Sequence, residues 1–490
     1  MPRLLTLLLF IVAALVNLWK LRPLDDLDTF NQIVLGSWFP RHLILTSNEP
    51  NTQVFIGWLA QVLFAVIHSL AGLAGIKTLN LLLLAGAFFL LGLWHAALVR
   101  ARGAIYPSML ALSAGLLSSF LVSASNTSAR PQSFAYLCFC GVLFLLTRWS
   151  TKGTKISIQC ASLYGIFIVW QNCHSSIVLA LPVIFVFILL RGCSPLLLVS
   201  VATAFFCTPD GASLISISAT NTEISKSLLL ISEWMPPWHY SVYSAMIGFW
   251  IVLAMTSVMS IIAYRRKVAI DPTPVLLSLL FLVPTLYSSR FGVFWGFVNA
   301  PLFGELVSAL WPGALGRRSI SEANSRTMAL CAATLLGVAV IFPGPLLPSA
   351  SPLATFQAAK AELPTARIFN YREFGGQLEY VGYPGWTAYI DGRLYLYPKE
   401  IWEQYNAISS ATPQTGLAKT LEAYDLLVLS PYAQAPLISF LRNNHVEGRF
   451  VLDSSEVVIF KTGKQAHDYS LPLEYPPSGS YDVHPNLQPR

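Results

Sequence analysis

The feature that most constrains this chain is a series of long apolar runs separated by short polar segments. A soluble domain carries about 25% charged residues, whereas these 490 residues are 11% charged and 54% hydrophobic. Apolar runs of this length are typical of membrane-spanning helices. The sequence therefore predicts an α-helical polytopic membrane protein with about 11 spans, near residues 4–20, 78–99, 104–124, 133–147, 156–172, 176–190, 194–208, 241–263, 273–288, 291–310 and 327–343.

The run Val54–Gly75 is ambiguous, because it is long enough to cross a membrane but contains Gln61 and His68. If it stays outside as a re-entrant or interfacial helix, and the N-terminus is cytoplasmic, the clustered arginines and lysines fall in inner loops, as the positive-inside rule requires. If it crosses, every later loop changes side and the rule fails, or the N-terminus moves out. The charge pattern favours the first arrangement.

The composition changes near residue 345, after a proline-rich linker. We expect a transmembrane domain over 1–345, with its first outer loop at 21–77. An extracytoplasmic small α/β domain over 346–463 and a Pro-rich tail over 464–490 should follow. Alternating patterns predict this domain. The expected helices are 353–363, 399–408 and 435–443, and the expected strands are 366–370, 388–391, 425–430, 449–453 and 457–461.

The first outer loop carries an acidic cluster that includes Asp26 and Asp28. A carboxylate at the membrane–water boundary can act as a general base for a hydroxyl or amine acceptor. A structural reading competes with this one, because Thr29-x-x-Gln32 fits a capping box and acidic residues stabilise a helix N-terminus. The two roles can coexist.

Isolated polar residues lie near the expected outer ends of the spans: Arg130, His174, Glu233 and Arg290. A guanidinium group matches a phosphate in a bidentate fork, so the two arginines are candidates for binding a lipid-linked phosphate. The structural alternatives are snorkelling arginines, an interior histidine with satisfied hydrogen bonds, and an interfacial anchor at Glu233.

Two further candidates end a predicted strand of the outer domain. Asp391 and Arg393 can pair with each other or recognise a ligand. Turn chemistry is the alternative, since Gly375-Gly376 permits a tight strand-to-helix turn and Asp391-Gly392 permits a turn with positive φ. The seven cysteines have no metal-ligand spacing. The net charge of +7 mostly reflects inner loops, and we expect no nucleic-acid partner.

Short motifs along the chain resemble those of a bacterial family of polytopic proteins with a GT-C glycosyltransferase-like fold. The residues that carry the resemblance are Asp26-x-Asp28-Thr29, Gly36, Gly57-Trp58-x-x-Gln61, Arg130-Pro131-Gln132, Trp170-x-Asn172-x-His174, Pro209-x-Gly211, Glu233-Trp234, Phe369-Asn370, Gly375-Gly376-x-Leu378 and Tyr389-Ile390-Asp391-Gly392-Arg393. The wider superfamily includes protein O-mannosyltransferases, aminoarabinose transferases and the catalytic subunit of oligosaccharyltransferase.

The resemblance implies a polyprenyl-phosphate-linked sugar donor, inverting transfer at the outer membrane face, and an acidic base at Asp26 or Asp28. The chain also departs from the pattern. The family's Trp-Trp-His is Phe30-Asn31-Gln32 here. The second outer loop, Asn126–Gln132, lacks the acidic metal-binding residues of oligosaccharyltransferases. We therefore expect no cofactor, and a divalent metal has no support from the sequence.

The sequence thus predicts a glycosyltransferase of the bacterial inner membrane, in contact with membrane lipids, acting on an unidentified glycan, lipid or protein acceptor. In this hypothesis Asp28, or Asp26, deprotonates the acceptor. Arg130 and Arg290 hold the donor phosphate, and His174 and Glu233 line the cavity. The outer domain, with Asp391 and Arg393, receives the acceptor. The alternative is a non-catalytic scaffold or subunit of an envelope or glycan-assembly complex. A secondary transporter is disfavoured, because matching halves with broken helices are not evident.

Overall fold

The chain forms two compact units, each built from separate segments. The computed structural model describes residues 2–24, 28–41, 43, 45–48, 54–103, 108–124, 126–227, 232–311, 322–348, 351–412, 415–444 and 446–463. Unit 1 comprises Met1–Arg22, Phe55–Leu59 and Lys77–Pro345, and unit 2 comprises Pro23–Val54, Ala60–Ile76 and Leu346–Arg490. The chain therefore leaves unit 1 and returns to it twice before its C-terminal segment begins.

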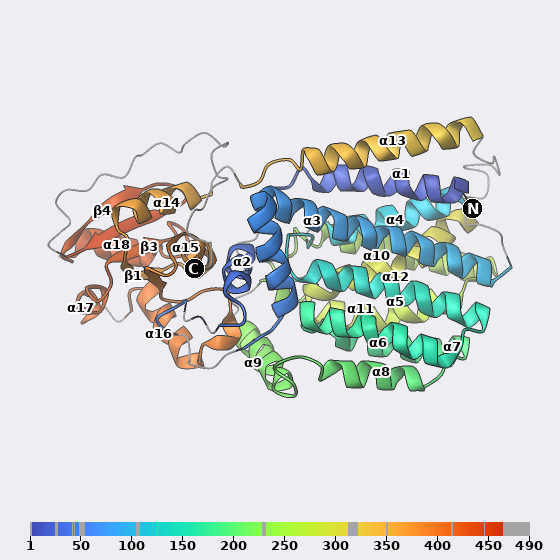
Figure 1. Cartoon of the computed structure of the whole chain (residues 1–490), viewed down its shortest axis with the longest axis horizontal. Coiled ribbons are helices and arrows are strands. Elements are labelled where there is room, and N and C mark those ends of the chain that lie inside the picture. Colours follow the sequence, from blue (N-terminus) through green and yellow to red (C-terminus); the bar gives the residue numbers. More distant parts are fainter. Residues whose placement is uncertain are drawn as a thin grey trace. The chain divides into compact units, whose positions relative to one another are not determined.

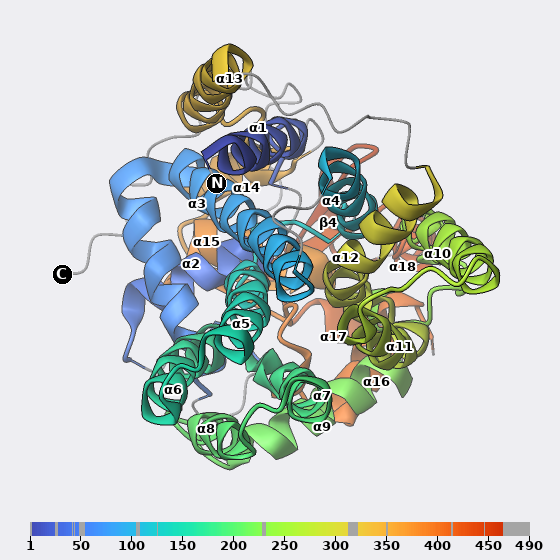
Figure 2. The same ribbon diagram turned by 90° about the vertical axis from the view of Figure 1, so that its right-hand side faces the viewer.

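Unit 1 is a bundle of helices that run side by side (Figures 1 and 2). Each of the eleven predicted spans corresponds to a helix or a pair of consecutive helices. The elements are α1 (Pro2–Trp19), α3 (Trp58–Ala101), α4 (Met109–Ser123), α5 (Gln132–Lys152), α6 (Ile156–Cys173), η1 (Ser175–Leu179), α7 (Ala180–Arg191), α8 (Leu196–Phe205), α9 (Ser213–Ser227), η2 (Ser232–Trp234), α10 (Ile247–Arg265), α11 (Pro272–Tyr287), η3 (Ser289–Phe291), α12 (Gly292–Leu310) and α13 (Glu322–Ile341).

The helices of unit 1 have the apolar character of a membrane domain. Within the described residues, four are long and apolar enough to cross a membrane, Trp58–Ala101, Gln132–Thr151, Ile247–Arg265 and Ser289–Leu310, and six further apolar helices are shorter. Exposed apolar side chains such as Ile251, Val258 and Ile261 on α10 suit contact with lipid. The chain is therefore a membrane protein, and the number of spans stays a prediction.

Close helix packing in unit 1 depends on small residues. A Cβ at Gly304 of α12 would lie 2.1 Å from the backbone oxygen of Ala111 in α4, and one at Gly115 of α4 would lie 2.5 Å from the oxygen of Ala300. Only glycine permits so close a backbone approach, which is a common way for helices to associate in lipid. In the same unit, Phe139 of α5 packs edge-on against Phe281 of α11 and Phe294 of α12.

Helix α3 is broken at Ala71 and Gly72, whose backbones leave the helical conformation (Gly72 φ 58°). The run Val54–Gly75 and the predicted span 78–99 thus belong largely to one interrupted element. Residues 60–76 of α3 belong to unit 2, where the backbone at Gln61 lies against Gly36 of α2 (Asp28–Trp38). Whether this part of α3 crosses the membrane stays a prediction.

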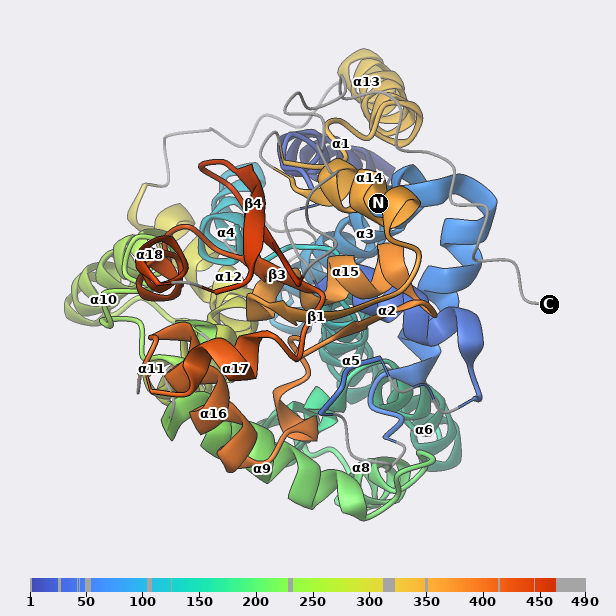
Figure 3. The same ribbon diagram turned by 90° about the vertical axis from the view of Figure 1, so that its left-hand side faces the viewer.

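The core of unit 2 is a five-stranded mixed sheet of order β2-β1-β3-β5-β4. Strands β1 (Ala366–Asn370), β2 (Trp386–Ala388) and β3 (Leu426–Leu429) are parallel, while β4 (Gly448–Asp453) and β5 (Val458–Thr462) pair antiparallel. Figure 3 shows α14 (Leu353–Glu362) and α15 (Gly375–Gly382) on one side of this sheet. Helices α16 (Lys399–Ser409), α17 (Leu417–Leu421) and α18 (Ala435–Asn443) lie on the other side. The short 3-10 helices η4 (Arg372–Phe374) and η5 (Leu394–Leu396) complete the unit.

The first loop extends the sheet beyond β2. Thr46 forms a parallel bridge to Ala388, and the backbone N–H of Ser47 donates to the oxygen of Ala388 (2.8 Å). This contact covers the edge of β2, which would otherwise present unpaired backbone groups.

Most predicted elements of this domain are confirmed within one or two residues, with a few exceptions. The strand expected at 388–391 is β2 at 386–388, because the chain leaves the sheet after Ala388. Helices α15 and α17 were not predicted. Gly375 begins α15 after β1 and η4, as a strand-to-helix turn requires, whereas Gly392 does not have the positive φ expected for its turn. The capping box also fails, since Thr29 is the second residue of α2 and not its N-cap.

Candidate functional site

Four of the predicted site residues meet in unit 1, and we call Arg130, His174, Glu233 and Arg290 the arginine cluster. Arg130 Nη1 donates to Glu233 Oε1 (2.9 Å), and Arg290 Nη1 lies 3.7 Å from the same oxygen. Arg290 Nη2 lies 3.4 Å from Nε2 of His174. Residues far apart in the sequence thus surround a single carboxylate.

Each member of the arginine cluster lies at a helix end or in a short 3-10 turn. Arg130 precedes α5, His174 caps the C-terminus of α6, and Glu233 and Arg290 lie in η2 and η3. The hydroxyls of Ser288 and Ser289 both donate to the backbone oxygen of Glu233 (3.1 and 2.9 Å). These bonds join η2 to η3 and fix Glu233 beside Arg290.

Two more side chains hold the Arg290 guanidinium. With its amide oriented to satisfy both of its polar atoms, Gln132 accepts from Arg290 Nη2 (2.6 Å) and Nε (3.2 Å). The guanidinium also lies over the Trp234 ring, 5.0 Å from its centroid, in a cation–π contact. Arg290 is thus held by a carboxylate, an amide and an aromatic face.

The cluster carries an excess of one positive charge. Burial, and then Arg290, lower the pKa of His174 to about 3, so its imidazole is neutral at physiological pH. Burial alone would raise the pKa of Glu233, but Arg130 and Arg290 outweigh it and hold the pKa below its usual value. Two guanidinium groups therefore face one carboxylate, an arrangement that favours a further anion such as a phosphate.

Other residues of the sequence motifs have structural contacts in unit 1. Trp58 Nε1 donates to Asn172 Oδ1 (2.6 Å), and Asn172 Nδ2 donates to the backbone oxygen of Cys207 (2.8 Å). The backbone N–H of Phe55 donates to both carboxylate oxygens of Asp210 (3.0 Å each). These bonds attach residues 55–59 to the end of α6 and to the loop after α8.

The remaining described site residues lie in unit 2. Asp28 is the first residue of α2 and is half-buried, while Asp26 lies outside the described residues. Asp391 and Arg393 are buried, with 0% and 7% of their surfaces exposed. Asp28 and the arginine cluster therefore belong to different units.

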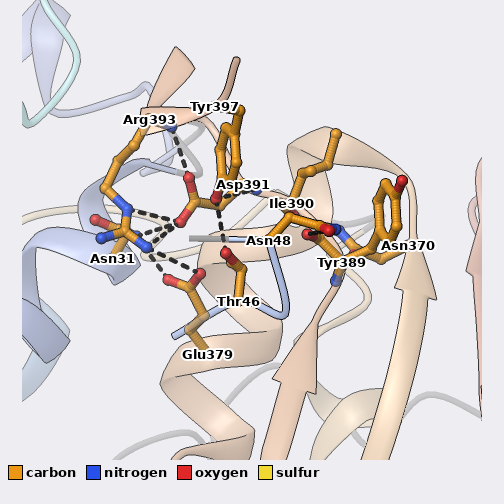
Figure 4. Close-up of polar contacts among 10 residues, drawn as sticks. All are labelled: Asn31, Thr46, Asn48, Asn370, Glu379, Tyr389, Ile390, Asp391, Arg393 and Tyr397. Atoms are coloured by element: carbon orange, nitrogen blue, oxygen red, sulfur yellow. Dashed lines mark hydrogen bonds and ion pairs between the residues drawn. The ribbon is translucent and has the colours of Figure 1, made fainter. Parts of the chain in front are cut away.

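Asp391 and Arg393 form a buried ion pair in which two guanidinium nitrogens contact one carboxylate oxygen. Together with Asn31 and Glu379 they make up what we call the buried polar network (Figure 4). Arg393 Nε and Nη2 lie 2.7 and 2.5 Å from Asp391 Oδ2, and Nη2 lies 3.8 Å from Glu379 Oε1. Asn31 Nδ2 donates to Glu379 Oε2 (2.6 Å) and to Asp391 Oδ2 (3.3 Å). Burial would raise the pKa of Asp391, but Arg393 outweighs it and keeps the pKa below its usual value.

Asp28 lies directly against the turn that carries this ion pair. A Cβ at Gly392 would lie 2.4 Å from Asp28 Oδ1. The predicted base and the two outer-domain candidates therefore lie side by side in unit 2. Asn31 and Glu379 were not among the predicted site residues, because they are 348 residues apart and no local pattern connects them.

The described part of the chain has no candidate metal site. No group of three histidine, cysteine, aspartate or glutamate side chains there could hold a metal ion. That the protein needs no cofactor stays a prediction.

Comparison with known proteins gives similarity at the level of the fold. No protein-family model matches the sequence, and no curated protein matches it. The oligosaccharyltransferase of Archaeoglobus fulgidus, tethered to an acceptor peptide containing the NVT sequon, aligns with a TM-score of 0.54 and 12% identity, over 94% of this chain and 74% of that one. Its apo form aligns with a TM-score of 0.54 and 12% identity, over 95% and 75%.

A third structure, the archaeal oligosaccharyltransferase AglB from the same organism with an inhibitory peptide and a dolichol-phosphate, aligns with a TM-score of 0.51 and 12% identity, over 94% of this chain and 74% of that one. At this identity the likeness concerns the fold. The GT-C-like fold expected from the sequence motifs is thus supported, and the chain is similar in architecture to a membrane-embedded oligosaccharyltransferase.

Proposed function

We propose that this protein is a membrane glycosyltransferase that moves a sugar from a polyprenyl-phosphate-linked donor to an acceptor at the outer face of the bacterial inner membrane. The observation that carries the proposal is the arginine cluster, in which two arginines face one carboxylate (Arg130–Glu233 2.9 Å, Arg290–Glu233 3.7 Å). The fold likeness supports the donor class, because one of the similar structures contains a dolichol-phosphate.

In the proposed reaction the acceptor, a glycan, lipid or protein, attacks the anomeric carbon of the sugar. Its O–H or N–H proton passes to the carboxylate of Asp28, with Asp26 as the alternative base. The new bond forms from the acceptor heteroatom to the anomeric carbon, the carbon–oxygen bond to the phosphate breaks, and the configuration inverts. The electron pair stays on the released polyprenyl phosphate, whose charge Arg130 and Arg290 stabilise.

The arginine cluster suits this task because its charges are already oriented. Gln132, Glu233 and Trp234 hold the Arg290 guanidinium before any ligand binds. Preorganised donors stabilise a developing charge more effectively than groups that must reorient. His174, neutral and next to Arg290, can accept or donate a hydrogen bond without adding a charge.

Binding of a long-chain polyprenyl monophosphate to the full chain in lipid nanodiscs tests donor recognition. We expect Arg290→Ala and Arg130→Ala to weaken binding at least tenfold, since each removes a charge-assisted contact to phosphate. Arg266→Ala, at an exposed arginine after α10, is the matched control. Equal binding by all three variants would exclude the arginine cluster as the phosphate site.

Transfer itself is tested with a panel of radiolabelled sugars linked to polyprenyl phosphate and a membrane extract as the source of acceptors. Asp28→Asn should reduce transfer to a small residual rate and leave binding of the polyprenyl phosphate unchanged. Wild-type protein that binds the lipid but transfers none of the sugars would support the second candidate below.

The second candidate is a non-catalytic scaffold or subunit of an envelope or glycan-assembly complex. One observation favours it: Glu233 already gives both arginines a carboxylate partner without a ligand. In that case the cluster joins the loops that carry its members, and its variants would lower the stability of unit 1 without a specific effect on lipid binding.

A further inference from the structure

The charged side chains most deeply buried in the described part of unit 2 lie beside Asp28. We propose that the buried polar network of Asn31, Glu379, Asp391 and Arg393 positions Asp28 through Gly392 and does not itself contact the substrate. This inference rests on the proposed function for the role of Asp28 as a base, and it changes the role expected for Asp391 and Arg393 from substrate binding to positioning.

Two observations support a positioning role: the ion pair is buried, and the carboxylate oxygens of Asp391 are already occupied by protein donors. Asp391 is fully buried, and its two carboxylate oxygens accept four hydrogen bonds. The backbone N–H of Arg393 binds Oδ1 (2.7 Å), while Arg393 Nε, Arg393 Nη2 and Asn31 Nδ2 bind Oδ2. A carboxylate with this many protein donors has little capacity left for a ligand. Contacts of Arg393 to both carboxylate oxygens, from its guanidinium to Oδ2 and from its backbone N–H to Oδ1, also fix the relative orientation of the two side chains.

The first turn of α2 lies along the turn Asp391-Gly392-Arg393 and contacts it at two positions. Asp28 and Asn31 are three residues apart on one helix, so their side chains lie on the same face. Asn31 donates to Asp391, and Asp28 lies against the neighbouring residue, Gly392. The helix is thus attached at Asn31, one turn from the carboxylate that the mechanism needs.

Two glycines make this arrangement possible. A Cβ at Gly392 would lie 2.4 Å from Asp28 Oδ1, and a Cβ at Gly375 would lie 2.7 Å from both Cα and Cβ of Asp391. Neither glycine needs an unusual backbone conformation, so close approach is the reason for each. The turn therefore fits between the start of α15 and the start of α2, with no space for a side chain on either side.

Side chains of the first loop also form hydrogen bonds with the stretch that carries this turn. The backbone N–H of Asp391 donates to Tyr397 Oη (3.2 Å), and that hydroxyl is hydrogen-bonded to Thr46 Oγ1 (3.1 Å). Asn48 Nδ2 donates to the backbone oxygen of Tyr389 (3.0 Å). Residues 46–48 thus attach to the same stretch as α2, so both parts of the first loop depend on the network (Figure 4).

Gly392→Ala tests the inference in the full chain. The substitution displaces the Asp28 carboxylate but removes neither that carboxylate nor a guanidinium group of the arginine cluster. We expect kcat to fall by about 100-fold, as for an ångström-scale misplacement of a catalytic group, with KM for the lipid-linked donor unchanged. In an Asp28→Asn background the same substitution should reduce the residual rate no further, because residues that act as a unit are non-additive. Effects that multiply in the double variant would overturn the proposal.

Gly382→Ala is the matched control. Its Cβ would lie 2.4 Å from the Trp386 side chain, in the same unit but away from Asp28. We expect it to lower the yield of folded protein and leave kcat per folded molecule unchanged. An equal loss of kcat in Gly382→Ala would show that crowding anywhere in unit 2 has this effect, which would also overturn the proposal.

A readout without sugar transfer separates this inference from the proposed function. Asn31→Ala and Asp391→Asn should speed amide hydrogen exchange in residues 28–38, and Gly382→Ala should not. If wild-type protein transfers no sugar but these variants release α2, the function fails and the positioning role of the network stands. If exchange in α2 is unchanged, the positioning inference fails whatever the activity.

Discussion

Arg290 Nη2 lies 3.4 Å from His174 Nε2, and the other ring nitrogen, Nδ1, accepts from the backbone N–H of Ser176 (3.3 Å). A guanidinium and a backbone N–H only donate, so both ring nitrogens face donors, an environment that disfavours the charged imidazolium. Ser176 Oγ lies 2.9 Å from Nδ1 and accepts from Trp170 Nε1 (3.0 Å). The histidine connects the end of α6 to Arg290 without carrying a charge.

The depressed pKa of His174 makes the stability of the protein depend on pH. The folded state binds the proton only near pH 3, whereas the unfolded chain binds it near the ordinary value of 6.5. The stability contributed by neutral His174 is therefore complete above about pH 6.5 and is lost as the pH falls toward 3. We expect His174→Gln to flatten the pH dependence of the melting temperature over this range, and His239→Gln, at a half-buried histidine of the same unit, is the control.

Glu233→Gln should affect stability and lipid binding in opposite directions. It removes a charged hydrogen-bond acceptor from Arg130 and should cost about 2 kcal/mol of unfolding free energy. It also removes the carboxylate that competes with a phosphate, so polyprenyl monophosphate should bind more tightly than to wild type, most clearly at low salt. Thermal unfolding and lipid titration measure the two effects. Glu223→Gln, at an exposed residue of α9, should change neither, and weaker lipid binding in Glu233→Gln would count against a phosphate site.

Arg393→Met should destabilise unit 2 strongly. It leaves the carboxyl groups of Asp391 and Glu379 buried without their guanidinium, a change that costs about 3–5 kcal/mol. Adding Asp391→Asn should recover part of the loss, because it removes one uncompensated charge. Denaturant titration of the three proteins measures both effects. Arg442→Met, which breaks an exposed ion pair with Asp453, should cost less than about 1 kcal/mol; a similar cost at both sites would contradict the importance of burial.

Gly36→Ala tests the packing of α2 against α3. A Cβ at Gly36 would lie 2.0 Å from the backbone oxygen of Gln61. A backbone atom cannot move aside as the end of a flexible side chain can. We expect a cost of about 1–3 kcal/mol from the forced overlap. Gly165→Ala, at a position of α6 with open space around it, should be neutral or slightly stabilising. Equal melting temperatures for the two variants would show that α2 and α3 can move apart at no cost in stability.

Local sequence patterns predicted most of the secondary structure, because helices and strands depend largely on residues that are neighbours in the sequence. The run Asp425–Ser430 is short, apolar and rich in residues typical of strands, and it forms β3. Tyr389-Ile390-Asp391 has the same appearance, yet it leaves the sheet because Asp391 pairs with Arg393. Helix α15 begins with two glycines, which are poor helix formers, so its start has no local signal.

The arginine cluster was partly accessible from the sequence, and the buried polar network was not. Arg130, His174, Glu233 and Arg290 were chosen because each follows or precedes an apolar run at the same expected membrane face, and the structure brings them together. Asn31 differs from the family pattern at its own position, and Glu379 lies in a short unpredicted helix. Their bond joins residues 348 positions apart, which only the fold can bring together.

The interleaved segments of unit 2 have a consequence for biosynthesis. Residues 23–54 and 60–76 emerge from the ribosome early, but their partners in unit 2 lie after residue 345. Until residues 77–345 have been synthesised and inserted into the membrane, Asn31 has neither Glu379 nor Asp391 to bind. The N-terminal segments of unit 2 therefore cannot form their native contacts before then. A chain truncated by premature termination would leave Asp28 without its turn, so the positioned carboxylate exists only in a completed polypeptide.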